Sequence, residues 1–347
     1  MIDPSDILKV KDNFAELNQI DSVLIKKAQC KLLPYICVCV PTYKRVSTLK
    51  ETIESILKQK GFDRFEIIIS DNNPERDDET ENYVNSLNDE RITYYKSRKG
   101  LGMYGNMNRL IQLSNSQVTV IIHDDDLLLP YFLRNAFKIM TAKENIDVLF
   151  TDKVLWDSNS TSLKTLKLPV SKDSTYLRKL GLLDFYFCNQ FPPTGVIFRT
   201  KKVLELGGYN TEVYPSNDYY FNIKAVLNSN VYFLDKPSFI YRWGVNASLK
   251  KETIIGFMKV DIPLQKWIAN KGLLFKLLYP IVYVNYSNSM YNFLIKYYPE
   301  SSKNEVKPYI FISEKKIYYI LVSRALKILN YIFKLRNKCH SKEYNLI

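Results

Sequence analysis

The sequence predicts an α/β fold in which a mostly parallel central sheet is flanked by helices, and three observations lead to this class. Between residues 34 and 140, short apolar runs rich in β-branched residues alternate with amphipathic helical patterns. The chain has 347 residues and is 46% hydrophobic, which suffices for a large core. Polar clusters follow several expected strands, as in parallel sheets that bind ligands at the carboxyl ends of their strands.

The first half of the chain alternates regularly between the two kinds of element. Tyr35 to Val40 is expected to be the first strand, in which Cys37 and Cys39 alternate with valines as small core residues. Val46 to Lys58 follows as an amphipathic helix. Further strands are predicted at 65–70, 91–95 and 118–122, and further helices at 79–87, 106–113 and 131–142.

Beyond Met140 the alternation weakens. Strands are predicted at 147–151, 231–234 and 239–241, a turn leading into a strand at 191–198, and helices at 219–227, 252–297 and 306–338. The Ser/Thr/Lys-rich residues 157–175 are expected to form a loop. Residues 1–33 are polar with a helical pattern, and we expect this extension to pack on the main domain.

The basic charge of the chain is concentrated near its C-terminus. The net charge is +13, and from Lys250 onward 17 Lys and Arg face only 6 Asp and Glu. The first 249 residues are nearly balanced, with 32 basic and 30 acidic side chains. Nucleic acid and anionic lipid are therefore both candidate partners of the last hundred residues.

Cysteine usage and the terminal segments bear on the compartment. The five cysteines form no CxxC pair and the only histidines are His123 and His340, so neither a zinc site nor a disulfide framework is expected, and a reducing cytosol fits. The first six residues lack the basic and apolar regions of a signal peptide. The longest apolar stretch, 273–284, is interrupted by Lys276 and Pro280 and is too short to span a bilayer.

Three consecutive carboxylates are the strongest chemical signal. Asp124, Asp125 and Asp126 follow the β-branched run 118–122, and Pro130 then opens a helical pattern. Like charges this close repel unless a cation compensates, and Mg²⁺ or Mn²⁺ is the natural partner of carboxylate oxygens and diphosphates. The triplet is interpreted as the floor of a nucleotide-diphosphate site. The alternative is a solvated Asp-rich turn that caps the following helix.

Several motifs then resemble, in order and spacing, those of family 2 glycosyltransferases of the GT-A fold. The resemblance covers about Tyr35 to Ser248. Each motif is weak by itself, but together they are specific. The matching pieces are Val38–Arg45, Phe65–Asn72, Gly102 with Asn108, His123–Asp126 with Pro130, Gly207–Gly208, Asn217–Asp218, and Tyr241–Arg242 with Ser248.

The resemblance implies a role for each matching position. Asp71 would accept a hydrogen bond from the N3–H of uracil, and Asp124 would lie beside the ribose and the metal. Asp125 would be the main metal ligand, with Asp126 beside it, and Asp218 would be the general base. The remaining nucleotide-sugar contacts would come from Pro41, Thr42, Tyr43, Arg45, Gly102 and Asn108.

The chain departs from the family pattern at three positions. His123 stands where the family has its first Asp, so that ligand is replaced. Met107 replaces the usual Arg before Asn108, and Gly244 replaces a His often found after the Tyr-Arg pair. These departures leave the metal shell beyond Asp125 open and could mean looser metal dependence.

The resemblance divides the chain into three regions. Residues 1–33 would be a helical extension, 34–249 a GT-A catalytic domain, and 250–347 a helical basic region. Within the catalytic domain, 34–140 would bind the nucleotide and 141–249 the acceptor.

The function so implied is transfer of a sugar, with inversion at the anomeric carbon, from a UDP-sugar to an acceptor in surface polysaccharide biosynthesis. Mg²⁺ or Mn²⁺ would be the cofactor. The acceptor would be an oligosaccharide or a lipid-linked glycan, and the enzyme would work in the cytoplasm on the inner face of the cell membrane.

Several alternatives stay open at this point. Asp218 precedes Tyr219 in a stretch that also reads as an ordinary helix N-cap. A nucleotidyltransferase would share the strand-end carboxylates, although the loop at Pro41 lacks the glycines of a phosphate loop. A basic nucleic-acid-binding protein is a third class, against which the chain shows no recognised nucleic-acid motif, and no nucleic-acid partner is expected.

The predicted helix at 306–338 combines an apolar stripe with basic residues such as Arg324, Lys327 and Lys334. Such a basic amphipathic helix is typical of binding to an anionic membrane surface. A helix docked on the catalytic domain with a solvated basic face explains the pattern equally well.

Overall fold

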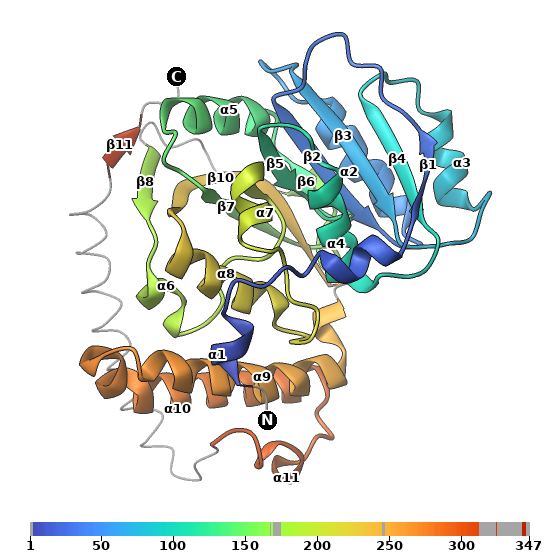
Figure 1. Cartoon of the computed structure of the whole chain (residues 1–347). Coiled ribbons are helices and arrows are strands. Elements are labelled where there is room, and N and C mark those ends of the chain that lie inside the picture. Colours follow the sequence, from blue (N-terminus) through green and yellow to red (C-terminus); the bar gives the residue numbers. More distant parts are fainter. Residues whose placement is uncertain are drawn as a thin grey trace.

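A mixed sheet runs through the whole molecule, with helices on both faces and a pair of long helices below it (Figure 1). The computed structural model describes residues 3–166, 168, 175–244, 247–311, 324 and 342–344. The long pair comprises α9 (Lys251–Ala269) and α10 (Leu273–Tyr297). None of the described helices is both long and apolar enough to cross a membrane.

The strand order is β1-β4-β3-β2-β5-β9-β7-β10-β8-β11, with β6 paired to β10. Strands β2, β3, β4 and β5 run parallel, whereas β9 lies antiparallel between β5 and β7. The strand bounds are β1 Ser22–Lys26, β2 Ile36–Thr42, β3 Phe65–Asp71, β4 Ile92–Ser97, β5 Val118–Ile121, β6 Leu127–Leu128, β7 Val148–Asp157, β8 Thr175–Lys179, β9 Val196–Arg199, β10 Val231–Trp243 and β11 Lys342–Tyr344.

The helices cover both faces of this sheet and build two cores. One core holds the apolar faces of α2 and α5, and the other holds those of α4, α8 and the long pair. The helix bounds are α1 Pro4–Ile7, α2 Val46–Leu57, α3 Glu79–Ser86, α4 Gly102–Leu113, α5 Phe132–Ala142, α6 Leu182–Tyr186, α7 Thr200–Glu205, α8 Asn217–Asn228 and α11 Lys303–Val306, with 3-10 turns at Ala15–Gln19, Leu163–Thr165 and Ala247–Leu249.

The strands and helices predicted between residues 34 and 142 are confirmed to within a few residues. The largest shift there is at α4, which begins at Gly102 instead of 106. In the second half, the two short strands predicted at 231–234 and 239–241 are one strand, β10. Parallel pairing with the ten-residue β7 holds β10 together across two irregularities around Pro237.

The helical prediction for residues 1–33 is wrong. From residue 3, where the described part of the chain begins, to residue 33 there are only two short helical turns, and Ser22–Lys26 is strand β1 instead. It pairs antiparallel with β4 and covers what would otherwise be an open sheet edge with unsatisfied backbone groups. Of the apolar residues that gave this segment its helical pattern, Leu17 lies in a 3-10 turn, whereas Leu24 and Ile25 lie in the edge strand.

The helix predicted at 252–297 is two helices. α9 ends at Ala269, and the extended backbone of Gly272 redirects the chain into α10. Val260 and Leu264 of α9 and Val282 of α10 belong to the main core. The helix predicted at 306–338 lies almost wholly outside the described residues.

The N-terminal segment is fastened to the main domain at Gly207. The backbone N–H of Asn13 donates to the Gly207 carbonyl at 3.1 Å. Gly207 has φ +75°, and a Cβ added there would lie 1.9 Å from the backbone oxygen of Lys11. Only glycine allows the two backbones to approach this closely.

We expect Gly207→Ala to lower the free energy of unfolding by about 2–4 kcal/mol, because it combines left-handed strain with a backbone clash. Urea denaturation followed by circular dichroism measures the loss. Gly100→Ala is the matched control, since its methyl group would meet one atom at 3.9 Å in ordinary contact. Equal stability of the two variants would contradict the fastening role of Gly207.

Candidate functional site

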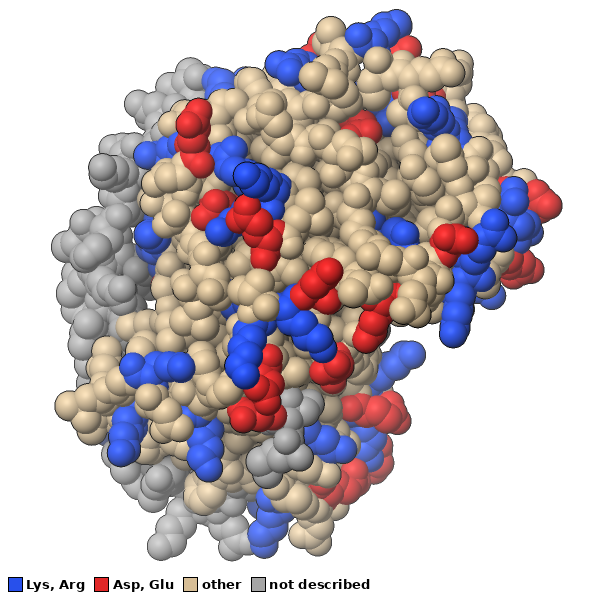
Figure 2. Space-filling model, viewed as in Figure 1, with Lys and Arg blue, Asp and Glu red and all other residues tan. Residues whose placement is uncertain are grey.

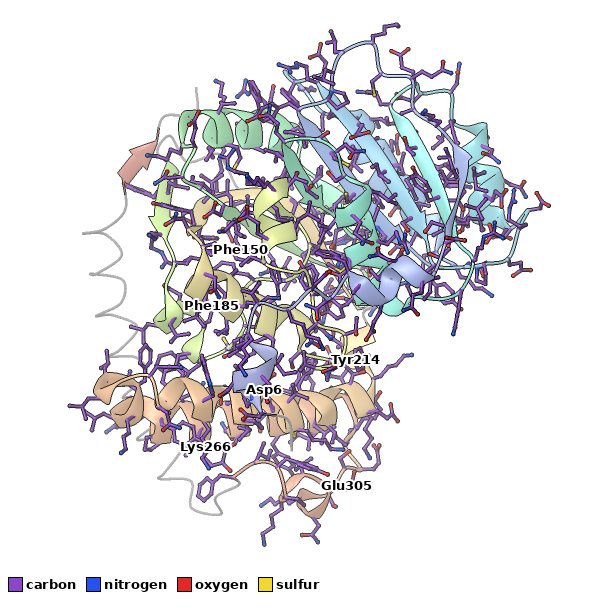
Figure 3. The ribbon with its side chains drawn as sticks, viewed as in Figure 1. Asp6, Phe150, Phe185, Tyr214, Lys266 and Glu305 are labelled. Atoms are coloured by element: carbon purple, nitrogen blue, oxygen red, sulfur yellow. The ribbon has the colours of Figure 1, made fainter. Side chains whose placement is uncertain are left out.

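A cavity of about 540 Å³ opens at the carboxyl ends of the parallel strands. The loop after β2 contributes Arg45, and the turn after β5 contributes His123 and Asp125. Asp218 enters from the first turn of α8. The opposite wall comes from α9 and α10, and Tyr214 lies between α8 and α9 (Figure 3). On this side the cavity is lined by residues that include Thr253, Phe257, Asp261, Tyr286 and Met290.

Backbone and side-chain hydrogen bonds fix the Asp triplet in a buried turn. Arg242 on β10 donates its backbone N–H to Asp126 Oδ1 at 2.9 Å and its guanidinium Nε–H to the Asp125 carbonyl at 2.8 Å. Thr52 of α2 donates to the carbonyl of Asp126 at 2.8 Å. The alternative of a solvated Asp-rich turn is therefore wrong, because all three aspartates are at most 5% exposed.

Arg45 compensates part of the charge of the triplet. Its Nη1 lies 2.9 Å from Asp125 Oδ2 and 3.5 Å from Asp124 Oδ1. Thr42 also donates to Asp124 Oδ2 at 2.8 Å. Burial, and then the neighbouring Asp125, raise the pKa of Asp124 to about 6. Burial likewise holds the pKa of Asp126 well above its ordinary range. The site thus has capacity for more positive charge than Arg45 supplies.

The donor atoms fit a divalent cation. One ligand atom each of His123, Asp125 and Asp126 lies within 4.8 Å of the others. Among the described residues, the buried Nε2 of His123 and Oδ2 of Asp126 have no hydrogen-bond partner. Burial lowers the pKa of His123, which keeps the imidazole neutral and able to donate a lone pair to a metal. The replacement of the family's first Asp by His123 therefore retains a candidate ligand.

Asp218 lies in the first turn of α8, with its carboxylate in the cavity. Asn189 donates to Asp218 Oδ2 at 2.9 Å, and the backbone N–H of Tyr219 lies 2.9 Å from Oδ1. Burial raises the pKa of Asp218 to about 6. The N-cap of α8 is Ser216, so the alternative that Asp218 is an ordinary N-cap is wrong. A carboxylate with this pKa is ionised at neutral pH and can still accept a proton readily.

The remaining predicted residues lie in two kinds of place. Tyr43 is 53% exposed in the loop after β2, and Pro41 is partly buried at the end of that strand. Gly102 opens α4 with φ +69°, a conformation that suits glycine. Asp71 and Asn108 are instead fully buried and do not line the cavity.

The structure gives the two buried residues internal partners. Asp71 accepts from Tyr94 Oη at 2.8 Å, from Lys96 Nζ at 3.1 Å and from the Asn73 backbone. The amide of Asn108 pairs with the backbone N–H and carbonyl of Tyr209, both at 2.8 Å. Asn108 thereby clamps the Gly207–Gly208 loop to α4. The geometry lends no support to their predicted nucleotide contacts, which stay predictions.

Sequence reasoning missed the second layer of the site. Asp261 of α9 is buried at the cavity wall, where it accepts from Ser216 Oγ and, at 2.8 Å, from Tyr286 Oη. Burial raises its pKa to about 7. A lone carboxylate in the apolar helical stretch 254–268 was a signal for it. Asn189, which contacts Asp218 from a distant loop, left no such signal.

The sequence is similar to those of known proteins. The model of glycosyl transferase family 2 matches residues 37–242, and the chain belongs to this family. The GalNAc(5)-diNAcBac-PP-undecaprenol beta-1,3-glucosyltransferase of Campylobacter jejuni is 28% identical over 218 residues, 60% of this chain and 65% of that protein. The putative colanic acid biosynthesis glycosyl transferase WcaA of Escherichia coli is 32% identical over 198 residues, which are 56% of this chain and 67% of that protein.

Solved structures agree on the fold. S. aureus TarS in complex with UDP-GlcNAc superposes with a TM-score of 0.56 at 18% identity, over 78% of this chain and 77% of that one. The predicted GT-A fold is thus confirmed. The chain spans just under two thirds of the length of the Campylobacter relative.

The three candidate ligands His123, Asp125 and Asp126, called here the cation cluster, lead to a prediction about metal affinity. We expect Asp125→Ala and His123→Ala each to weaken Mn²⁺ binding at least tenfold, because each substitution removes one of the three candidate ligands. Titration followed by the electron paramagnetic resonance of free Mn²⁺ measures this without turnover. Asp63→Asn, an exposed residue after α2, is the control. Unchanged affinity in His123→Ala would remove the imidazole from the ligand set.

Proposed function

We propose that the protein is an inverting, divalent-metal-dependent glycosyltransferase that moves a sugar from a UDP-sugar to a lipid-linked glycan acceptor in polysaccharide synthesis. The observation that carries this proposal is the convergence of His123, Asp125 and Asp218 on one cavity, with Asp126 beside the first two, in a family 2 chain. A screen of UDP-sugars for Mn²⁺-dependent hydrolysis tests the donor class. Hydrolysis confined to other nucleotide sugars would overturn the UDP assignment.

On the donor side, the chain holds a diphosphate against the turn after β5. Mg²⁺ or Mn²⁺ held by His123, Asp125 and Asp126 would neutralise the leaving diphosphate as a Lewis acid. Arg45 adds a partly exposed positive charge to the same side, since its side chain is 39% exposed. The Thr42 hydroxyl donates to Asp124 and so holds this carboxylate where it would lie beside the ribose.

On the acceptor side, Asp218 is the base that receives the hydroxyl proton. Its ionised form is favoured by the Asn189 amide and disfavoured by burial, which gives a carboxylate basic enough to act near neutral pH. Attack of the acceptor oxygen on the anomeric carbon, on the face opposite the leaving diphosphate, inverts the configuration. The arrangement of a base and a separate leaving-group site matches a single displacement.

The lipid-linked acceptor is supported by two considerations. The Campylobacter relative is named for an undecaprenol-linked substrate. The acceptor wall of the cavity carries Phe257, Met290 and Phe293 from the long helix pair, beside Trp243 of β10. Such apolar and aromatic surfaces suit sugar faces and the beginning of a lipid chain. The enzyme would then work as a peripheral protein on a membrane surface.

We expect Asp218→Asn to reduce transfer at least a thousandfold while leaving UDP affinity within about twofold, because the variant keeps the shape of the side chain and one acceptor oxygen but cannot accept a proton. Initial rates and calorimetric UDP binding measure the two quantities. Asp63→Asn again serves as the exposed control. Near-normal turnover in Asp218→Asn would show that another group is the base.

The pH dependence follows from the raised pKa of Asp218. Because the ionised carboxylate is the active form, kcat/KM should fall as the pH drops through about 6. Asn189 stabilises the ionised form, so Asn189→Ala should raise the pKa and move this acid limb to higher pH. Rate profiles between pH 4.5 and 9, at roughly unit intervals, measure the shift. A limb that moves to lower pH would contradict the assignment.

A further inference from the structure

The junction of the two long helices exposes a cluster of large apolar side chains. Leu273, Leu274 and Leu277 in the first turns of α10 are 74%, 56% and 67% exposed. Single exposed leucines are ordinary on protein surfaces, but three within one helical turn form a contiguous patch. Nothing in the catalytic machinery described above uses these side chains.

Lysines surround this cluster without any acidic residue nearby in the sequence. Lys266, Lys271 and Lys276 are exposed at the same junction, and no Asp or Glu occurs between residues 262 and 297. Figure 2 shows the consequence at the lower left, where Lys and Arg gather without Asp or Glu over this end of the helix pair. Lys266 points outward below α10 in Figure 3.

Trp267 adds an amphipathic ring to the junction. Lys271 Nζ lies 3.8 Å from the ring centroid, and the indole Nε1–H donates to Ser5 at 2.9 Å. Leucine, tryptophan and lysine gathered at one junction are the composition of protein surfaces that sit in the headgroup region of a bilayer. An acidic protein partner would account for the lysines but would not require the exposed leucines. A nucleic acid would also be attracted by the lysines, but it would leave the leucines unburied.

We propose that this junction, formed by Leu273, Leu274, Leu277, Lys266, Lys271 and Lys276 and called here the α10 patch, docks the enzyme on an anionic lipid bilayer. The proposal deepens the proposed function and rests on it for the lipid-linked acceptor. The same helix carries Tyr286 and Met290 in the cavity wall, and twelve residues of helix separate Leu274 from Tyr286 by about 18 Å. Docking at the α10 patch would therefore hold the acceptor wall within reach of a glycan projecting from the membrane.

The test is sedimentation of the full chain with vesicles, in the absence of donor and acceptor. The wild type should bind vesicles of phosphatidylcholine with about 30% phosphatidylglycerol, a strongly anionic surface, and bind neutral vesicles more weakly. The variant Leu273→Gln/Leu274→Gln/Leu277→Gln should lose at least tenfold in binding, since the apolar contribution disappears. The variant Lys266→Gln/Lys271→Gln/Lys276→Gln should lose binding to anionic vesicles selectively. Because salt screens the lysines, added salt should bring the vesicle affinity of the wild type closer to that of this variant.

A matched control separates the patch from general surface hydrophobicity. Leu32→Gln/Leu33→Gln/Leu227→Gln replaces three exposed leucines elsewhere and should bind as the wild type does. Wild-type binding by the α10 leucine variant would overturn the proposal, and so would failure of the wild type to bind any vesicle. Concentration-dependent dimers in sedimentation velocity that the leucine variant abolishes, without vesicle binding, would assign the patch to self-association instead.

The readout also distinguishes this proposal from the proposed activity. Vesicle binding needs no turnover, so it stands or fails independently of the sugar donor. If the patch is the dock, the leucine variant should still hydrolyse UDP-sugar at the wild-type rate, because its substitutions lie on the solvent face of α10. Loss of hydrolysis together with loss of binding would show that the substitutions damage the fold and would count against a role confined to docking.

Discussion

The burial of three adjacent carboxylates at the end of β5 is the constraint on which the rest of the site depends. Such a cluster is unfavourable in a low-dielectric interior unless hydrogen bonds and positive charge compensate it. Arg242 supplies hydrogen bonds from one strand, and Arg45 supplies charge from the loop after another. These two contacts join the loop after β2 and the strand β10 at the triplet, so elements from both halves of the sheet are positioned by the same charges.

The C-terminal helices take part in the same arrangement. Asp261 of α9 holds Ser216, the N-cap of α8, and thereby fixes the turn that carries Asp218. Tyr286 of α10 holds the other oxygen of Asp261. The last hundred residues are therefore more than a basic appendage, because α9 and α10 close the cavity and orient its proposed base. Residues 251–297 also carry six lysines against two acidic residues.

The interior partners of Asp71 and Asn108 show what a motif leaves undetermined about side-chain contacts. Both residues occupy the expected strand and helix, yet their polar atoms are bonded to Lys96 and Tyr209. A motif position records which backbone site a residue occupies. Whether its side chain faces a ligand depends on neighbours that come from other parts of the chain, here more than twenty positions away for Lys96 and a hundred for Tyr209.

The sequence by itself determined the α/β class and the strands and helices between residues 34 and 142, and its resemblance to family 2 glycosyltransferases singled out Arg45, Asp125 and Asp218. The class and the elements follow from local periodicity, and the clustering of polar residues follows from the rule that parallel strands bring their carboxyl ends together. Only the tertiary structure decided that His123 joins the cation cluster, that Asp261 supports the turn of α8, that residues 22–26 form an edge strand, and that α9 and α10 wall the cavity. Each of these depends on which distant surfaces remain to be covered once the local elements have packed, a long-range property that no local pattern encodes.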